Sequence, residues 1–168
     1  AVVGVLWVGR LSNYTLICDS VTSVLCQITA AITGSLGNFF ATEDKHAGYA
    51  LFKKVEFLNF WLYGFSFIAL VTLLDPFVQI WAGERFVLGL PISIAIAINF
   101  FVAGYMNTLW VFRSTIGLFK QGKFRPILVA ILNIILSIFL GKLWGVFGVL
   151  FATFLSRAAI SLWYDPLI

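Results

Sequence analysis

Charged residues are scarce in this sequence. They make up 11% of its 168 residues, less than half the share in a typical soluble domain, and only seven are acidic. A membrane transferase that binds a diphosphate through a divalent metal needs a cluster of acids. Glu43-Asp44 is the only adjacent acidic pair, and Lys45 and His46 follow it directly. The scarcity of acids argues against such an enzyme, and we predict that the chain is not an enzyme.

The side chains that usually hold metals are also few. His46 is the only histidine, and the two cysteines, Cys18 and Cys26, lie eight positions apart in one apolar segment. We expect these cysteines to be small packing residues rather than a disulfide or a metal pair. A phosphate-binding loop of the G-x-x-x-x-G-K type is missing as well. The sequence therefore predicts no cofactor and no metal site.

Hydrophobic residues dominate what is present. They form 61% of the chain, and the mean hydropathy is +1.02. Several apolar segments approach or exceed the length of about 20 residues that a helix needs to cross a bilayer. The net charge of +4 comes from cations placed between these segments, as expected for membrane topology rather than for a nucleic-acid partner. We predict an all-α, polytopic membrane helix bundle in contact with the lipid bilayer.

Five transmembrane spans are predicted from the apolar segments. The four prolines fall at span ends, which supports the boundaries. Residues 1–9 are too short to cross and are interpreted as the tail of a preceding helix, so we expect the chain to be a piece of a longer protein. The predicted spans are residues 11–40, 57–74, 88–112, 127–140 and 144–164, with a short interfacial helix within 41–56 and a basic interfacial segment at 113–126.

The basic segment orients the chain. Its cations have no acid among them, and together with those of 41–56 they make seven on one side of the membrane against three on the other. The chain is then expected to begin outside, to cross five times and to end in the cytoplasm. The residues expected to contact anionic headgroups are Lys53, Lys54, Lys120, Lys123 and Arg125. Arg113, at the end of a span, either binds a phosphate with its guanidinium or only sets the topology.

A polar stripe follows one face of the first span. Its members recur at steps of three and four, and Gln27 widens the stripe. Such a face must turn toward protein or water, so it is either a surface for close packing of small residues or the wall of a cavity. The members of the stripe are Ser12, Thr15, Asp19, Thr22, Cys26, Thr29 and Thr33.

Asp19 and Arg157 are ionisable residues inside predicted spans. Charges at such depth are costly and usually face a bundle interior or water. They are therefore candidates for a substrate or ion site, and a direct pair between them is possible. For Arg157 the alternative is that its long side chain extends toward the headgroups.

Several short motifs follow one another in a particular order along the chain. The late motifs are Ile131-Leu132-Asn133 through Ser137, Gly145 to Val149 with Gly148, Thr153 and Ser156. The earlier ones are Gly9 with Ser12-Asn13-Tyr14, Gly37-Asn38 with Ala41-Thr42-Glu43, Phe57 to Trp61, Phe112-Arg113, Gly117-Leu118-Phe119 and Arg125-Pro126. In their order and spacing these motifs resemble polysaccharide-repeat flippases, the O-antigen and capsule exporters of the multidrug/oligosaccharidyl-lipid/polysaccharide (MOP, MATE-like) superfamily. Arg10 and Leu11 depart from that family's turn after Gly9.

The resemblance implies about five helices from the C-terminal half of a two-lobed transporter in a bacterial cytoplasmic membrane. It implies movement of an undecaprenyl-diphosphate-linked oligosaccharide between leaflets, together with the N-terminal half and in the neighbourhood of a polysaccharide polymerase. The candidate substrate-binding residues are Asp19, Gln27, Arg113, Asn133 and Arg157. A related exporter of drugs or of the peptidoglycan lipid precursor, and a membrane-embedded glycan-assembly enzyme, are the alternatives.

Overall fold

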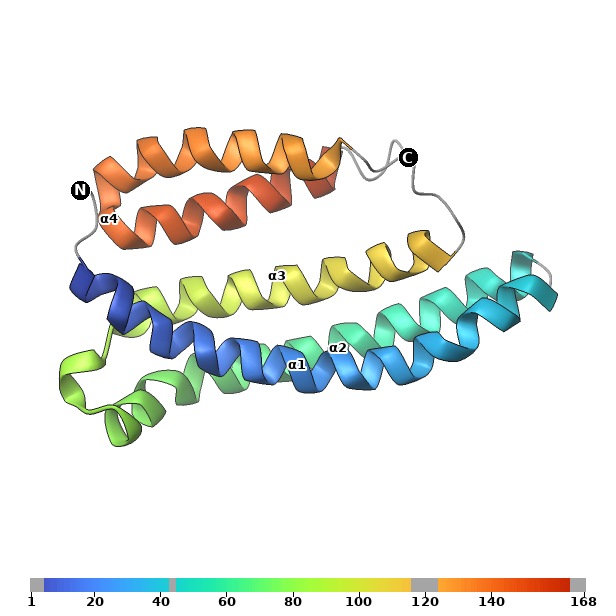
Figure 1. The fold of residues 1–168 in the computed structure, drawn as a ribbon, viewed down its shortest axis with the longest axis horizontal. Coiled ribbons are helices and arrows are strands. Elements are labelled where there is room, and N and C mark those ends of the chain that lie inside the picture. Colours follow the sequence, from blue (N-terminus) through green and yellow to red (C-terminus); the bar gives the residue numbers. More distant parts are fainter. Residues whose placement is uncertain (1–4, 43–44, 116–123, 164–168) are drawn as a thin grey trace.

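The computed structural model describes residues 5–42, 45–115 and 124–163. Its elements are α1 (Val5–Thr42), α2 (Lys45–Trp81), the short 3₁₀ helix η1 (Glu84–Phe86), α3 (Leu90–Thr115) and α4 (Arg125–Trp163). Helices make up all the regular structure in these ranges, and the four α-helices are long and apolar enough to cross a membrane (Figure 1). The expectation of an all-α chain is confirmed for the described residues, and so is the expectation of helices that are long and apolar enough to cross a membrane.

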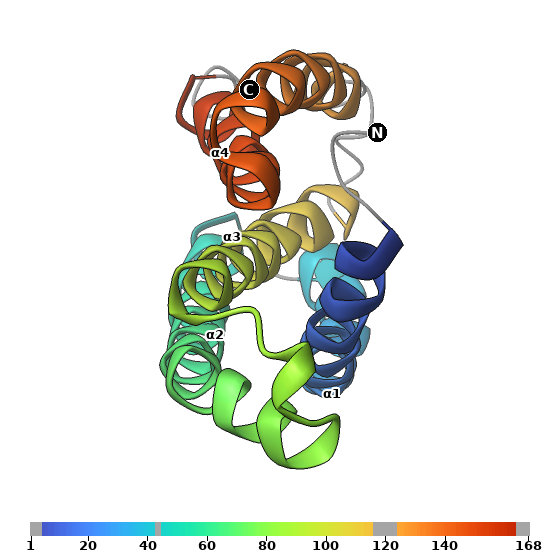
Figure 2. The same ribbon diagram turned by 90° about the vertical axis from the view of Figure 1, so that its left-hand side faces the viewer.

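α3 lies at the centre of the arrangement. It contacts α1 and α2 on one side and α4 on the other, as the end-on view in Figure 2 shows. A buried cluster that includes Tyr14, Tyr63, Leu74 and Phe100 holds α1, α2 and α3 together. Gly104 permits the close contact between α2 and α3, because a Cβ at this position would overlap the Tyr63 ring.

The first helix begins earlier than the sequence predicts. α1 runs without a break from Val5 through Gly9 and Arg10, where a turn between two helices was expected. A Cβ at Gly9 would meet nothing within 4 Å, so this glycine serves no close approach. Arg10 and Leu11 are both good helix formers, which suits a continuous helix at this point.

The second helix is also longer than predicted, because α2 joins the expected interfacial helix to the span and continues through Pro76 to Trp81. Pro76 removes one backbone hydrogen bond, which membrane helices tolerate when neighbouring groups compensate. Separately, the adjacent Asp75 accepts hydrogen bonds from Tyr14 of α1 and Ser93 of α3, which connect this part of α2 to its neighbours. With 37 residues α2 is about 55 Å long, well beyond a hydrocarbon core of about 30 Å, and Lys53 and Lys54 are exposed on it.

α4 is a hairpin. The backbone leaves the helical conformation at Gly145 (φ 60°, ψ −134°), two residues after the predicted turn at 141–143, and the two arms lie side by side in Figure 1. We call residues 125–144 the first arm and residues 146–163 the second arm. A Cβ at Gly148 would overlap the backbone carbonyl of Leu140, so glycine is needed where the arms approach each other.

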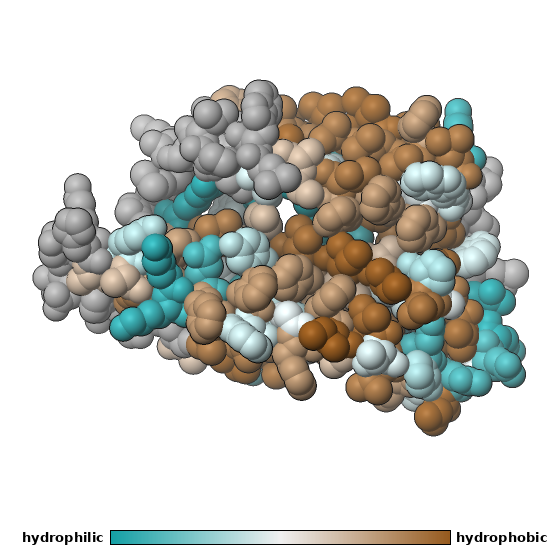
Figure 3. All heavy atoms as spheres, turned by 180° about the vertical axis from the view of Figure 1, so that it is seen from behind, coloured by the Kyte–Doolittle hydropathy of each residue, from teal (hydrophilic) through white to brown (hydrophobic). Residues whose placement is uncertain are grey.

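Large hydrophobic side chains cover much of the exterior. Phe65, Ile80, Phe139 and Leu143 are each more than half exposed. On the face drawn in Figure 3, hydrophobic residues dominate the middle and hydrophilic ones gather toward the two ends. A bilayer matches this distribution, because lipid contact makes exposed apolar surface favourable.

Candidate functional site

Two cavities lie on either side of α3. The first, which we call the α3–α4 cavity, has a volume of about 510 Å³ and lies between α3 and both arms of α4. The second, the α1–α3 cavity, has a volume of about 460 Å³ and is lined by α1, α3 and the second arm, with Tyr63 from α2. Ala103, Thr153 and Arg157 line both cavities. The two spaces therefore meet at Arg157.

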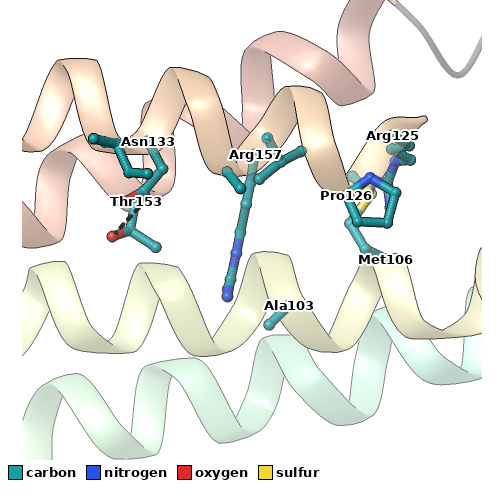
Figure 4. A pocket seen from close by; sticks show the side chains of 10 residues that line it. Ala103, Met106, Arg125, Pro126, Asn133, Thr153 and Arg157 are labelled. Atoms are coloured by element: carbon teal, nitrogen blue, oxygen red, sulfur yellow. Dashed lines mark hydrogen bonds between the residues drawn. The ribbon is translucent and has the colours of Figure 1, made fainter. Parts of the chain in front are cut away.

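Arg157 extends from the second arm toward α3, with its guanidinium near Ala103 (Figure 4). Arg125, at the start of the first arm, lines the same α3–α4 cavity. Its Nη2 donates to Ser161 Oγ at 3.0 Å and lies 3.2 Å from Met106 Sδ. Two guanidinium groups of like charge in one cavity repel each other, and an anion bound between them would relieve that repulsion.

Asn133 fixes the wall of this cavity. Its Nδ2 donates to Thr153 Oγ1 at 3.1 Å and to Ser156 Oγ at 3.2 Å, and its Oδ1 accepts from Ser137 Oγ at 3.2 Å. The two bonds from Asn133 Nδ2 join the first arm to the second arm within about one helical turn of Arg157. The polar residues of the late motif are thus one hydrogen-bonded group, as the Asn133–Thr153 contact in Figure 4 illustrates.

The α1–α3 cavity is lined by hydroxyl, amide and thiol groups. Asn107 Nδ2 and Tyr63 OH each lie 3.9 Å from Cys26 Sγ. Asn99 Nδ2 donates to the carbonyl oxygens of Ala95 and Leu150, at 2.9 and 2.8 Å, while its buried Oδ1 accepts no hydrogen bond from the described residues. A buried acceptor without a donor favours a water or a ligand hydroxyl at this wall.

Asp19 faces the α1–α3 cavity from α1, as do Thr15 and Thr22. Of the two interpretations of the polar stripe, this placement favours the cavity wall. Within the described ranges no ion pair joins Asp19 to Arg157, although both line this space.

The other predicted site residues lie elsewhere. Gln27 is exposed on α1, and Arg113 is half-buried in the last turn of α3; neither lines the two cavities. Lys53 Nζ lies 4.9 Å from the centre of the Tyr49 ring, and Lys54 is exposed. Lys120 and Lys123 lie outside the described residues. The structure therefore brings Asp19, Asn133 and Arg157 together around α3, but not Gln27 or Arg113.

Arg125 is placed differently from the prediction. We expected it to contact headgroups, but its side chain is half-buried and bonds to Ser161 inside the α3–α4 cavity. A cation at the end of an apolar segment has the same appearance in sequence whether it turns outward or inward. The position of the second arm decides the matter, because it supplies Ser161.

Sequence reasoning also missed a hydrogen-bonded cluster on Asp75. Its Oδ1 accepts from Tyr14 OH and from Ser93 Oγ, both at 2.6 Å, and Tyr14 OH in turn accepts from Leu88 N at 2.9 Å. The sequence signal is an aspartate next to a proline within an apolar stretch, where the proline alone predicts the end of a span.

Comparisons with protein-family models, with curated proteins and with solved structures find no match to this chain.

Proposed function

We propose that this chain forms the cation-lined part of a lipid-linked oligosaccharide flippase of the MOP superfamily. The ligand is an undecaprenyl-diphosphate-linked repeat unit, moved across the bacterial cytoplasmic membrane by alternating access together with an N-terminal half. The chain would cross the membrane five times, with each arm of α4 as one crossing. The observation that carries the proposal is the presence of Arg125 and Arg157 in one cavity inside membrane-spanning helices.

The chemistry of the two cavities suits the parts of such a ligand. A diphosphate needs fixed cations, and a guanidinium can bind it through two parallel hydrogen bonds. Sugars need hydroxyl and amide partners, which Thr15, Thr22, Asn99 and Asn107 present in the adjoining α1–α3 cavity. The prenyl chain stays in the bilayer. An exporter of cationic drugs fits less well, because two guanidinium groups repel a cation.

The test is complementation. The natural protein that contains this chain is expressed in a strain without its own repeat-unit flippase, and surface polysaccharide is quantified. We expect export to be restored, and to fall about tenfold or more in Arg125→Gln and in Arg157→Gln, because each loses hydrogen bonds to a charged group worth about 1.5–3 kcal/mol.

Arg85→Gln is the matched control, since Arg85 is an exposed arginine on η1, outside both cavities. Membrane abundance of each variant is measured by immunoblot. Export at the wild-type level in both cavity variants would refute the phosphate site. Rescue of a strain that lacks the peptidoglycan lipid flippase, without any surface polysaccharide, would assign the chain to that related exporter instead.

A further inference from the structure

The cluster on Asp75 connects three helices and a loop through one carboxylate oxygen. Tyr14 comes from α1, Asp75 from α2 and Ser93 from α3, while Leu88 belongs to the segment between η1 and α3. Tyr14 and Ser93 are fully buried, with 0% of their surface exposed. Hydrogen bonds to an ionised acceptor are stronger than neutral ones, and a partly water-excluded position strengthens them further.

This cluster lies at one end of the α1–α3 cavity. Thr15, the next residue after Tyr14, lines the cavity, and so does Ile96, which follows Ser93 by one helical turn. The opposite end of the cavity is marked by Cys26 and Asn107, whose side chains lie 3.9 Å apart. Tyr14, Asp75 and Ser93 are therefore the next layer of side chains beyond the cavity wall.

A proline and two glycines lie in the chain beside the cluster. Pro76 follows Asp75 directly and lacks the N–H that would bond the preceding turn of α2. Gly83 and Gly89 flank η1, with φ values of 100° and 89°, and a Cβ at either would meet no atom within 4 Å. Val78, Phe86 and Leu88 of the same segment pack in the buried cluster that joins α1, α2 and α3, so these apolar contacts act together with the hydrogen bonds to Asp75.

We propose that Tyr14, Asp75 and Ser93 form a latch that closes the α1–α3 cavity at this end and that releases it when the hydrogen bonds to Asp75 break. In the closed state Asp75 holds α1 and α3 against α2. In the open state these hydrogen bonds are broken, and water enters between α1 and α3 at this end. This device does not depend on which ligand the cavity binds.

The native cysteines provide a probe of the latch. Cys18 lines the cavity one turn from Tyr14 and is only 6% exposed, whereas Cys26 lies at the far end and is partly exposed. The natural protein is purified in nanodiscs and treated with a small hydrophilic maleimide, and the rate at each cysteine is followed by site-resolved mass spectrometry. Tyr14→Phe should raise the rate at Cys18 about tenfold, because losing a hydrogen bond to a carboxylate costs about 1.5 kcal/mol in the closed state.

Tyr105→Phe is the matched control. Tyr105 OH donates to Glu56 Oε1 at 2.7 Å, so this variant loses the same kind of bond between helices at a distance from the cluster. It should leave the rate at Cys18 unchanged. Ser93→Ala, which keeps Tyr14 in place, should raise the rate in the same direction as Tyr14→Phe.

Two results would overturn the latch. One is an unchanged rate at Cys18 in both Tyr14→Phe and Ser93→Ala. The other is an equal rise with Tyr105→Phe, which would mean that losing any such bond loosens the whole bundle.

Discussion

At the scale of single residues, Asn133 shows how one amide joins two helices in an apolar setting. It donates to Thr153 and Ser156 and accepts from Ser137, so both ends of its amide are satisfied. Thr153 and Ser156 also donate to backbone carbonyls of their own arm, at 3.1 and 3.0 Å. Removing the amide would leave these hydroxyls with one partner each rather than none.

Because Thr153 and Ser156 keep their backbone hydrogen bonds, replacing the Asn133 amide should cost only the bonds that the amide itself makes. Asn133→Leu keeps the approximate volume but deletes the bonds between the arms, and we expect it to lower the free energy of unfolding by about 1–2 kcal/mol, the range for polar contacts between membrane helices. The measurement is denaturant or thermal unfolding in detergent. Ser137→Ala, which removes a single bond within the first arm, should cost less. A larger loss for Ser137→Ala would contradict the assignment of Asn133 as the connection between the arms.

Sequence alone gives part of this picture at the residue scale. The resemblance selects Asn133, Ser137, Thr153 and Ser156 as one motif, and the structure supplies the reason, since they bond to one another. Hydropathy picks out Asp19 and Arg157 as charges within apolar segments, and both line a cavity. The inward position of Arg125 has no sequence signal, because it depends on a partner 36 positions away.

At the scale of elements, the α4 hairpin depends on two glycines with different tasks. Gly145 adopts a positive φ that other residues rarely adopt, and this ends the first arm. Gly148 leaves room for the Leu140 carbonyl, and this lets the second arm return closely beside the first. One glycine therefore sets the direction of the chain and the other sets the distance between the arms.

Two glycine substitutions distinguish the effect of close contact between the arms on stability from the effect of helix propensity. Gly148→Ala should destabilise the protein by about 1–3 kcal/mol, since its Cβ overlaps a backbone atom that has no rotamer to adopt. Gly9→Ala should be neutral or stabilising by up to about 1 kcal/mol, because this helical glycine has open space around it. Thermal unfolding of both variants in the same detergent provides the measurement. Equal changes in stability in Gly148→Ala and Gly9→Ala would mean that the arms do not meet at Gly148.

The elements themselves follow from hydropathy, but their ends do not. Length and apolar content identify every long helix, and the break between the last two predicted spans falls within two residues of Gly145. The proline rule fails at Pro76, where the helix continues and Asp75 is bonded to both neighbouring helices. The proline rule considers only neighbouring residues, so it cannot take account of these bonds: Tyr14 lies 61 positions before Asp75.

At the scale of the whole molecule, α3 separates two cavities that share Arg157. The α3–α4 cavity holds two arginines, whereas the α1–α3 cavity combines Arg157 with Asp19. The first space therefore favours an anion, and the second carries charges of both signs. This division of charge depends on which helices are neighbours in the fold. A single sequence does not show which helices are neighbours.

Asp19 is expected to weaken anion binding at Arg157. A carboxylate on the wall of the shared space opposes a second negative charge, with an energy on the order of 1 kcal/mol at an effective dielectric constant of about 20. We expect Asp19→Asn to tighten the binding of undecaprenyl diphosphate to the protein in nanodiscs by about two- to tenfold. Titration calorimetry at low and high salt provides the measurement, and the gain should shrink as salt screens the charges.

The specificity of this effect can be tested through Arg157. In an Arg157→Gln background Asp19→Asn should give a smaller gain, because the anion has then lost the cation that holds it near the Asp19 carboxylate. Glu84→Gln, which removes an equal charge from the exposed 3₁₀ helix, should leave the affinity unchanged. Weaker binding in Asp19→Asn would contradict this prediction.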